Sequence, residues 1–163
     1  MRFWLKFGHS MTATSFLGAV IVLWVMLDRL PQPDQALEIY VAQRQLIERI
    51  TSLVLMPSLL ISLLFGLASM AAVPGFHGAP WAWAKLVTTV LMLEGSLLGI
   101  QSPVKREALL AEKALIDASQ ISQLASSVAS EQSSLVLIGV VATTNVALGV
   151  WRPKFRAKAK AST

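Results

Sequence analysis

The side chains of this chain that could do chemistry are few, and they stand in or beside long apolar stretches. Glu94 lies in the middle of one stretch, and Lys85 enters the same stretch nine residues earlier. His9 opens the first stretch, and His77 stands in the short turn after the second. Neutral imidazole is a ligand for transition metals and haem iron. An ionisable group inside an apolar helix is typical of a binding or proton-transfer site.

Each of three residues at the edge of these stretches also has a structural interpretation. His9 could be satisfied by a backbone carbonyl or water, and His77 could be a solvated turn residue. Lys85 stands near the start of its stretch, where its long side chain can reach the lipid headgroups. Alternatively, Lys85 could hold an anionic group, such as a porphyrin propionate, beside His9. Residue spacing leaves both interpretations open.

Glu94 is the acid that we expect to lie deepest in the apolar region. At ~100° and ~1.5 Å per residue, it falls on the opposite helix face from Lys85 and ~13 Å deeper, so the two cannot pair. The expected partners are polar residues of the fourth stretch, namely Thr143, Thr144 and Asn145. Glu94 either stabilises the bundle as a protonated hydrogen-bonding group or relays protons or cations.

The composition predicts a membrane protein. Hydrophobic residues make up 55% of the 163 residues and charged residues 14%, which leaves too little polar surface to coat a globule. Four apolar runs reach the ~20 residues that a membrane-spanning helix needs. We therefore predict an all-α fold, a single four-transmembrane-helix bundle, with the first run retained rather than cleaved as a signal peptide. The runs are residues 7–27, 50–73, 82–101 and 132–151.

The charges predict how this bundle is oriented. With four spans, both termini and the turn between spans two and three share one side, which carries several Lys and Arg residues and no acid. The other side mixes acids and bases. Cations accumulate on the cytoplasmic side, so we predict a multi-pass protein of a bacterial inner membrane with both termini inside. The basic tail, residues 152–163, is then expected to contact anionic lipid and not nucleic acid.

The two connections on the far side have helical composition. Residues 34–51 and 104–131 are rich in helix formers and carry apolar residues near helical spacing. We expect them to extend the second and fourth helices outside the membrane, where they pack on each other or dock a membrane or periplasmic protein partner. Pro57 is expected to kink the second span. Gly95 and Gly99 form a G-x-x-x-G motif that permits tight helix packing or a homo-oligomer.

Three segments resemble a family of small bacterial membrane proteins. The run WLKFGHSMTATSFLGAVIVLWV, the run WAWAKLVTTVLMLEG and the ending NVALGVWRPKF are similar to the HemJ-type protoporphyrinogen oxidase, CopD-like and DUF2269-like group. In the HemJ proteins the first-span histidine ligates haem b and the third-span lysine is needed for activity. The resemblance implies these roles for His9 and Lys85. The long helical extensions depart from the HemJ pattern.

The resemblance makes haem b or porphyrin binding beside His9 one functional hypothesis, with redox chemistry or electron transfer as the activity. His77, a methionine such as Met70 or an open position would face the ligand opposite His9. This hypothesis requires small residues near His9, and the candidates are Ala13, Ala82 and Thr88.

Two rival hypotheses come from other function classes. One is a non-enzymatic oligomeric scaffold that presents its projecting helices to a partner. The other is a proton- or cation-conducting oligomer centred on Glu94. Lys85 and Glu94 are the candidate catalytic residues of the chain. The sequence contains no nucleotide-binding glycine loop, no cysteine and no cluster of metal ligands, so it gives no support to kinase, ATPase or hydrolase activity.

Overall fold

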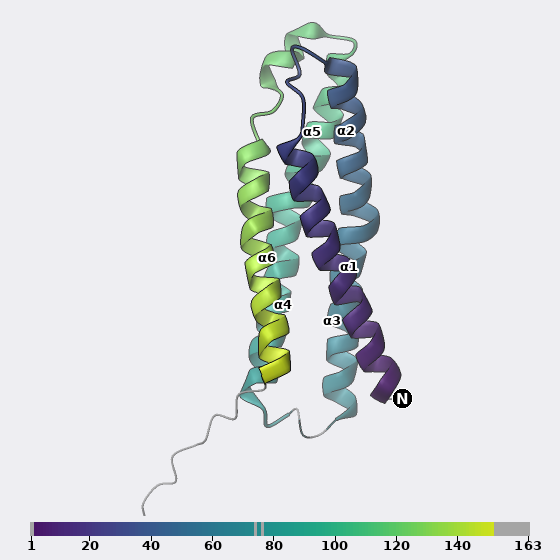
Figure 1. Cartoon of the computed structure of the whole chain (residues 1–163), viewed down its shortest axis with the longest axis vertical. Coiled ribbons are helices and arrows are strands. Elements are labelled where there is room, and N and C mark those ends of the chain that lie inside the picture. Colours follow the sequence, from purple (N-terminus) through teal and green to yellow (C-terminus); the bar gives the residue numbers. More distant parts are fainter. Residues whose placement is uncertain (1, 74, 76, 152–163) are drawn as a thin grey trace, which may run out of the picture.

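The chain folds as an elongated bundle of helices (Figure 1). The computed structural model describes residues 2–73, 75 and 77–151, and no strand occurs among them. The predicted basic tail, 152–163, lies outside the described residues. The all-α prediction is confirmed for the part of the chain that the structure describes.

The first two thirds of the chain form three long helices, and two of them contain a π-helical segment. In the second and third helices a short π-helical segment joins two α-helical segments without interruption, and a 3₁₀ helix precedes the last helix. The elements are α1 (Arg2–Asp28), α2 (Leu37–Ile50), η1 (Thr51–Leu55), α3 (Met56–Ala72), α4 (Pro80–Ser96), η3 (Leu97–Gln101), α5 (Ser102–Ala114), η4 (Ala118–Gln123) and α6 (Val128–Trp151).

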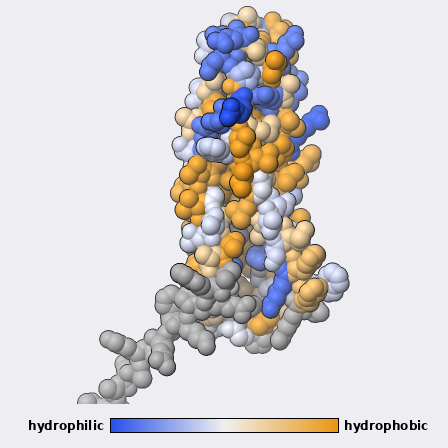
Figure 2. Space-filling model, in the orientation of Figure 1, coloured by the Kyte–Doolittle hydropathy of each residue, from blue (hydrophilic) through white to orange (hydrophobic). Residues whose placement is uncertain are grey.

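Four of the resulting helices are long and apolar enough to cross a membrane, which confirms the four runs predicted from the sequence at this level. They comprise Phe3–Asp28, Leu37–Ala72, Pro80–Ala114 and Val128–Gly149. Hydrophobic side chains cover much of the middle of the molecular face in Figure 2, and hydrophilic ones gather at the end where α2 and α5 lie. Proteins that fold in water rarely expose so large an apolar surface.

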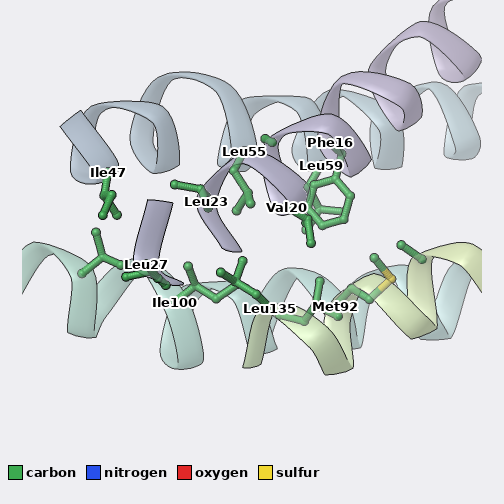
Figure 3. Packing of buried hydrophobic residues seen from close by; sticks show 14 residues of the cluster. Phe16, Val20, Leu23, Leu27, Ile47, Leu55, Leu59, Met92, Ile100 and Leu135 are labelled. Atoms are coloured by element: carbon green, nitrogen blue, oxygen red, sulfur yellow. The ribbon is translucent and has the colours of Figure 1, made fainter. Parts of the chain in front are cut away.

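The four long helices form a square in which each packs on two neighbours. Helix α1 contacts α3 and α6, and α4 also contacts α3 and α6. The core runs along the axis of this square and consists of aliphatic residues with one phenylalanine and one methionine (Figure 3), including Phe16, Leu23, Leu55, Met92 and Leu135. Leu23, Leu55, Ile100 and Leu135, one from each long helix, are almost completely buried.

The helical continuation predicted for the second helix is present in the structure, and the one predicted for the fourth is not. Helix α2 runs into α3 as expected, although it begins at Leu37. The segment predicted to extend the fourth helix instead continues the third, as α5, and the chain then breaks before α6. The break has local causes: the Asp117 carboxylate caps η4 by accepting from the Ser119 amide at 3.0 Å, and Ala125 has a left-handed backbone with φ 64°.

Both π-helical segments come directly before a proline. Pro57 follows η1 and Pro103 follows η3, each within the first two positions of the next α-helix. Proline has no backbone N–H to donate to the carbonyl four residues earlier, and its ring collides with that carbonyl. The wider π-helical turn relieves this collision, so the helix can continue. The sequence predicted a distortion at Pro57, and it did not predict that the helix would also pass Pro103. The two segments lie side by side, with the Gln101 amide 3.5 Å from Ser52 Oγ.

Helices α1 and α3 approach closely at the end of the bundle that carries the N-terminus. A Cβ added at Gly8 would lie 2.5 Å from Cζ of the Phe65 ring, a distance that real Cβ atoms do not reach. A Cβ added at Gly18, further along α1, would have no atom within 4 Å. A side chain at position 8 would therefore collide with the Phe65 ring beside His9.

This spacing predicts opposite effects for two glycine substitutions in α1. We expect Gly8→Ala to destabilise the fold by about 1–3 kcal/mol, the usual effect of overpacking. Gly18→Ala should be neutral or stabilising by up to about 1 kcal/mol, because alanine is the better helix former. Unfolding of both variants in mild detergent, followed by circular dichroism, measures the difference. Equal stability of the two variants would contradict the close contact.

Candidate functional site

A cavity of about 660 Å³ opens among the long helices. Residues of all four line it: Leu5 to Leu17 of α1, Ser62 to Met70 of α3, Trp81 to Thr89 of α4, and Val146 and Gly149 of α6. Its volume lies within the ~300–1,000 Å³ typical of small-molecule sites. Because its walls come from the first turns of α1 and α4, the cavity lies toward the end of the bundle that carries the N-terminus (Figure 1).

His9 is the side chain in this cavity whose geometry is best defined. Its Nδ1 lies 2.9 Å from the backbone oxygen of Ser62 and 3.1 Å from Ser62 Oγ. A carbonyl oxygen only accepts, so Nδ1 carries the proton and donates it to Ser62. The neutral ring then keeps an unprotonated Nε2, for which the described residues offer no hydrogen bond. This is the tautomer in which histidine ligates a metal through Nε2.

The charges on the cavity wall have one sign. Lys6 and Lys85 both line it, and no acid stands among its described lining residues. Gly149 makes room for Lys85, since a Cβ there would lie 2.7 Å from Lys85 Nζ. Most of the remaining wall is aliphatic or aromatic, with several hydroxyl groups. Such a surface favours a ligand with an apolar body and an anionic group.

The structure brings together some of the residues that the sequence predicted and separates others. His9 and Lys85 share the cavity with Ala13, Ala82 and Met70, as the porphyrin hypothesis requires. The structure does not bring two further predicted residues to this wall. Thr88 donates to Asn145 Oδ1 at 2.7 Å, and Thr89 lines the cavity instead. His77 lies in the exposed turn, where its carbonyl accepts from the Trp83 indole at 3.0 Å.

Within a single chain, Glu94 does not meet the partners that the sequence predicted. Glu94 is exposed on the outside of α4, because it stands two residues, or ~200° of helix, from both Met92 and Ser96, which are buried. The expected partners are also engaged elsewhere. Thr143 and Thr144 donate to carbonyls of their own helix, both at 2.8 Å, and Asn145 pairs with Thr88. Glu94 therefore lines no path through the interior of a single chain.

Sequence reasoning missed a buried ionic cluster at the opposite end of the bundle. Arg44 of α2 is completely buried, and its Nη1 lies 2.7 Å from Oε2 of Glu131 in α6. Its Nη2 lies 3.9 Å from Oε1 of Glu107 in α5. Tyr40 receives a hydrogen bond from Arg44 Nε at 3.1 Å and donates to Glu107 at 3.2 Å. The cluster therefore ties three helices together.

The cluster also holds the chain break before α6. The amide of Ala125, the residue with positive φ, donates to Glu107 Oε1, and Ser127 Oγ donates to Glu131 Oε1 at 2.6 Å. The sequence carried a weak signal for this cluster, since Tyr40 and Arg44 share one face of α2 at a spacing of four residues. Their partners, 67 and 87 residues further along the chain, left no such signal.

Comparison with known proteins adds nothing to this geometry. No protein-family model, no curated protein and no solved structure matches the chain. Among the residues that the structure describes, no group of three His, Asp or Glu side chains could hold a metal ion. The resemblance to the HemJ group stays a prediction.

The ionic cluster predicts unequal effects for its members. Arg44→Met leaves the carboxylates of Glu131 and Glu107 buried without their cation, and we expect it to destabilise the fold by about 3–5 kcal/mol. Glu107→Gln keeps an oxygen that accepts from Tyr40 and Ala125, so it should cost less than half as much. Unfolding in mild detergent measures both. Similar losses in the two variants would show that Arg44 is not the centre of the cluster.

Proposed function

We propose that this chain is an integral membrane protein that binds haem b or a porphyrin in the cavity beside His9, and that it acts in redox chemistry or electron transfer. The observation that carries this proposal is the hydrogen bond from His9 Nδ1 to the Ser62 carbonyl at 2.9 Å. This bond fixes the orientation and the tautomer of the ring. It leaves Nε2 unprotonated, and thus able to ligate a metal, beside a cavity large enough for a small-molecule ligand.

The cavity wall supports the same class of ligand. A porphyrin has a flat apolar body and two carboxylates, and the wall combines apolar side chains with Lys6 and Lys85. A lysine ammonium that meets a carboxylate away from bulk water forms a charge-assisted hydrogen bond, which is stronger than a neutral one. His9 would therefore hold the metal, and Lys85 and Lys6 would hold the anionic edge.

The opposite side of such a ligand would face Met70 or an open position. Met70 shares the cavity with His9, and methionine sulfur is an established axial ligand of haem iron. Bound haem would supply one-electron or oxygen chemistry, and the residues of this chain would bind and orient it. Binding of carbon monoxide to the reduced protein separates the two arrangements, because only an open position admits it readily.

The membrane assignment rests on length, composition and charge. The second and third helices contain 36 and 35 residues, or roughly 50 Å each, against a hydrocarbon core of ~30 Å. We infer that α2 and α5 project from the membrane. The N-terminus, the turn between α3 and α4 and the end of α6 lie at one end of the bundle (Figure 1). The positive-inside rule assigns this end to the cytoplasm of a bacterial inner membrane.

Haem ligation by His9 predicts a spectrum that depends on one of the two histidines. Protein purified in mild detergent from iron-replete cells, or incubated with hemin, should show a Soret band with α and β bands on reduction. His9→Ala should lose these bands because the iron loses its ligand. His77→Ala is the matched control and should keep them, since His77 lies in the exposed turn. A colourless folded wild type, or bands that depend on His77, would overturn the proposal.

The position of Lys85 predicts a charge-dependent affinity for the same ligand. Lys85→Met removes the ammonium but keeps a flexible apolar side chain, and we expect hemin to bind about 10–100-fold more weakly, the value of a hydrogen bond to a charged group. Lys85→Arg should recover most of the affinity. Titration of the apoprotein with hemin measures each constant. The lysine would have no binding role if Met and Arg variants bound alike.

A further inference from the structure

The outer surface of α4 carries a carboxyl group at a depth where a single chain gives it no partner. Glu94 points away from the bundle and is surrounded on this face by exposed apolar residues. We call this surface the α4 face; it consists of Val87, Val90, Leu91 and Glu94 of α4 and of Leu97 and Leu98 of η3, which continues it. No described residue forms a hydrogen bond or ion pair with Glu94. An acid at membrane depth is costly unless it is protonated, paired or hydrogen-bonded.

A groove with complementary chemistry lies on another side of the same bundle. It runs between α1 and α6 and encloses about 540 Å³. Its walls are apolar, from residues such as Trp24 and Val140, except for the hydroxyl groups of Thr143 and Thr144. Both hydroxyls use their protons within α6, so their remaining lone pairs can accept a hydrogen bond. We call this surface the α1/α6 groove.

Small residues along α6 allow a helix to approach this groove closely. Gly139, Thr143 and Ala147 line it at intervals of four residues, so they share one face of α6. Small residues at this spacing are typical of tight helix contacts in membranes. The groove is therefore shaped to receive a helix of another chain.

The α4 face and the groove hold their polar groups at the same depth. Asn145 of α6 bonds to Thr88 at 2.7 Å and to Met92 Sδ at 3.5 Å. Asn145 is therefore level with the part of α4 that lies midway between Thr88 and Met92. Helices α4 and α6 are antiparallel. From this level Glu94 lies about four residues along α4, and Thr143 lies two residues along α6 in the same direction. At ~1.5 Å per residue, their depths differ by only about 3 Å.

We propose that the α4 face of one copy docks into the α1/α6 groove of a second copy, where protonated Glu94 donates a hydrogen bond to Thr143 or Thr144. Copies in one membrane share one orientation, so the Glu94 carboxyl and the Thr143 hydroxyl meet with a vertical shift of only about 3 Å. The contact joins two different surfaces, and a closed ring fills every groove. The interface rests on the membrane insertion proposed above and is independent of haem binding.

Cysteine cross-linking tests this interface without interference, because the chain has no cysteine of its own. Leu98 of the α4 face and Val136 of the groove are 69% and 53% exposed. They lie near one depth, since position 99 approaches Ser134. Leu98→Cys and Val136→Cys copies with different tags would be co-expressed and oxidised in native membranes. Leu53→Cys is the matched control for depth. Leu53 is 73% exposed, and it follows Ser52, which is level with Gln101.

The proposed interface predicts a mixed disulfide between Leu98→Cys and Val136→Cys copies, and much less product when Leu53→Cys replaces either. Adding Glu94→Leu should reduce the mixed product about three- to tenfold, the effect of losing one hydrogen bond between membrane helices. Glu94→Gln keeps a donor and should restore it. Elution as a single helical species confirms that each variant is folded.

Three results would overturn the interface. Disulfides between two Leu98→Cys copies without the mixed product would indicate a two-fold contact through Glu94 itself. Cross-linking that is unchanged by Glu94→Leu would remove the role of the carboxyl group. Equal product from Leu53→Cys would mean that the copies merely collide. The haem spectrum of the same membranes separates failure of the interface from failure of the proposed ligand.

Discussion

A chain this apolar can fold only if nearly every polar side chain finds a hydrogen-bonding partner, and this requirement organises the whole bundle. Several threonines donate to a carbonyl of their own helix, as Thr143 and Thr144 do. Asn145 bridges α6 and α4 through Thr88 and Met92. The guanidinium of Arg44, with no exposed surface, is placed against two carboxylates. These pairs fix which faces of the helices meet.

The same requirement is met differently at the two ends of the bundle, by an ionic cluster at one end and by a polar cavity wall at the other. At one end, Arg44, Glu107 and Glu131 join α2, α5 and α6 with side chains that are wholly buried, so this end is held together and closed. At the other end, the polar groups beside His9 line a cavity. The aliphatic core around Leu23 and Leu135 separates the two (Figure 3). The ionic cluster therefore closes one end of the bundle, and the cavity lies toward the other.

The sequence predicted the features that depend on composition and local spacing, and it missed those that depend on distant partners. Hydropathy located the four long helices, and the shared depth of His9 and Lys85 followed from where their helices begin. The outward direction of Glu94 did not follow, because valine and leucine stand on every side of it in the sequence and hide which face is buried. The continuation of the helix through Pro103 also required a π-helical turn, which sequence patterns do not reveal.

The partner of His9 has consequences for what the cavity can hold. A carboxylate partner would make the imidazole more basic and would add a negative charge, whereas the Ser62 carbonyl orients the ring and adds none. Lys6 and Lys85 line the cavity, and no acid stands among its described lining residues. Away from bulk water these cations attract an anion strongly. A neutral imidazole beside two cations suits a ligand that carries an anionic group.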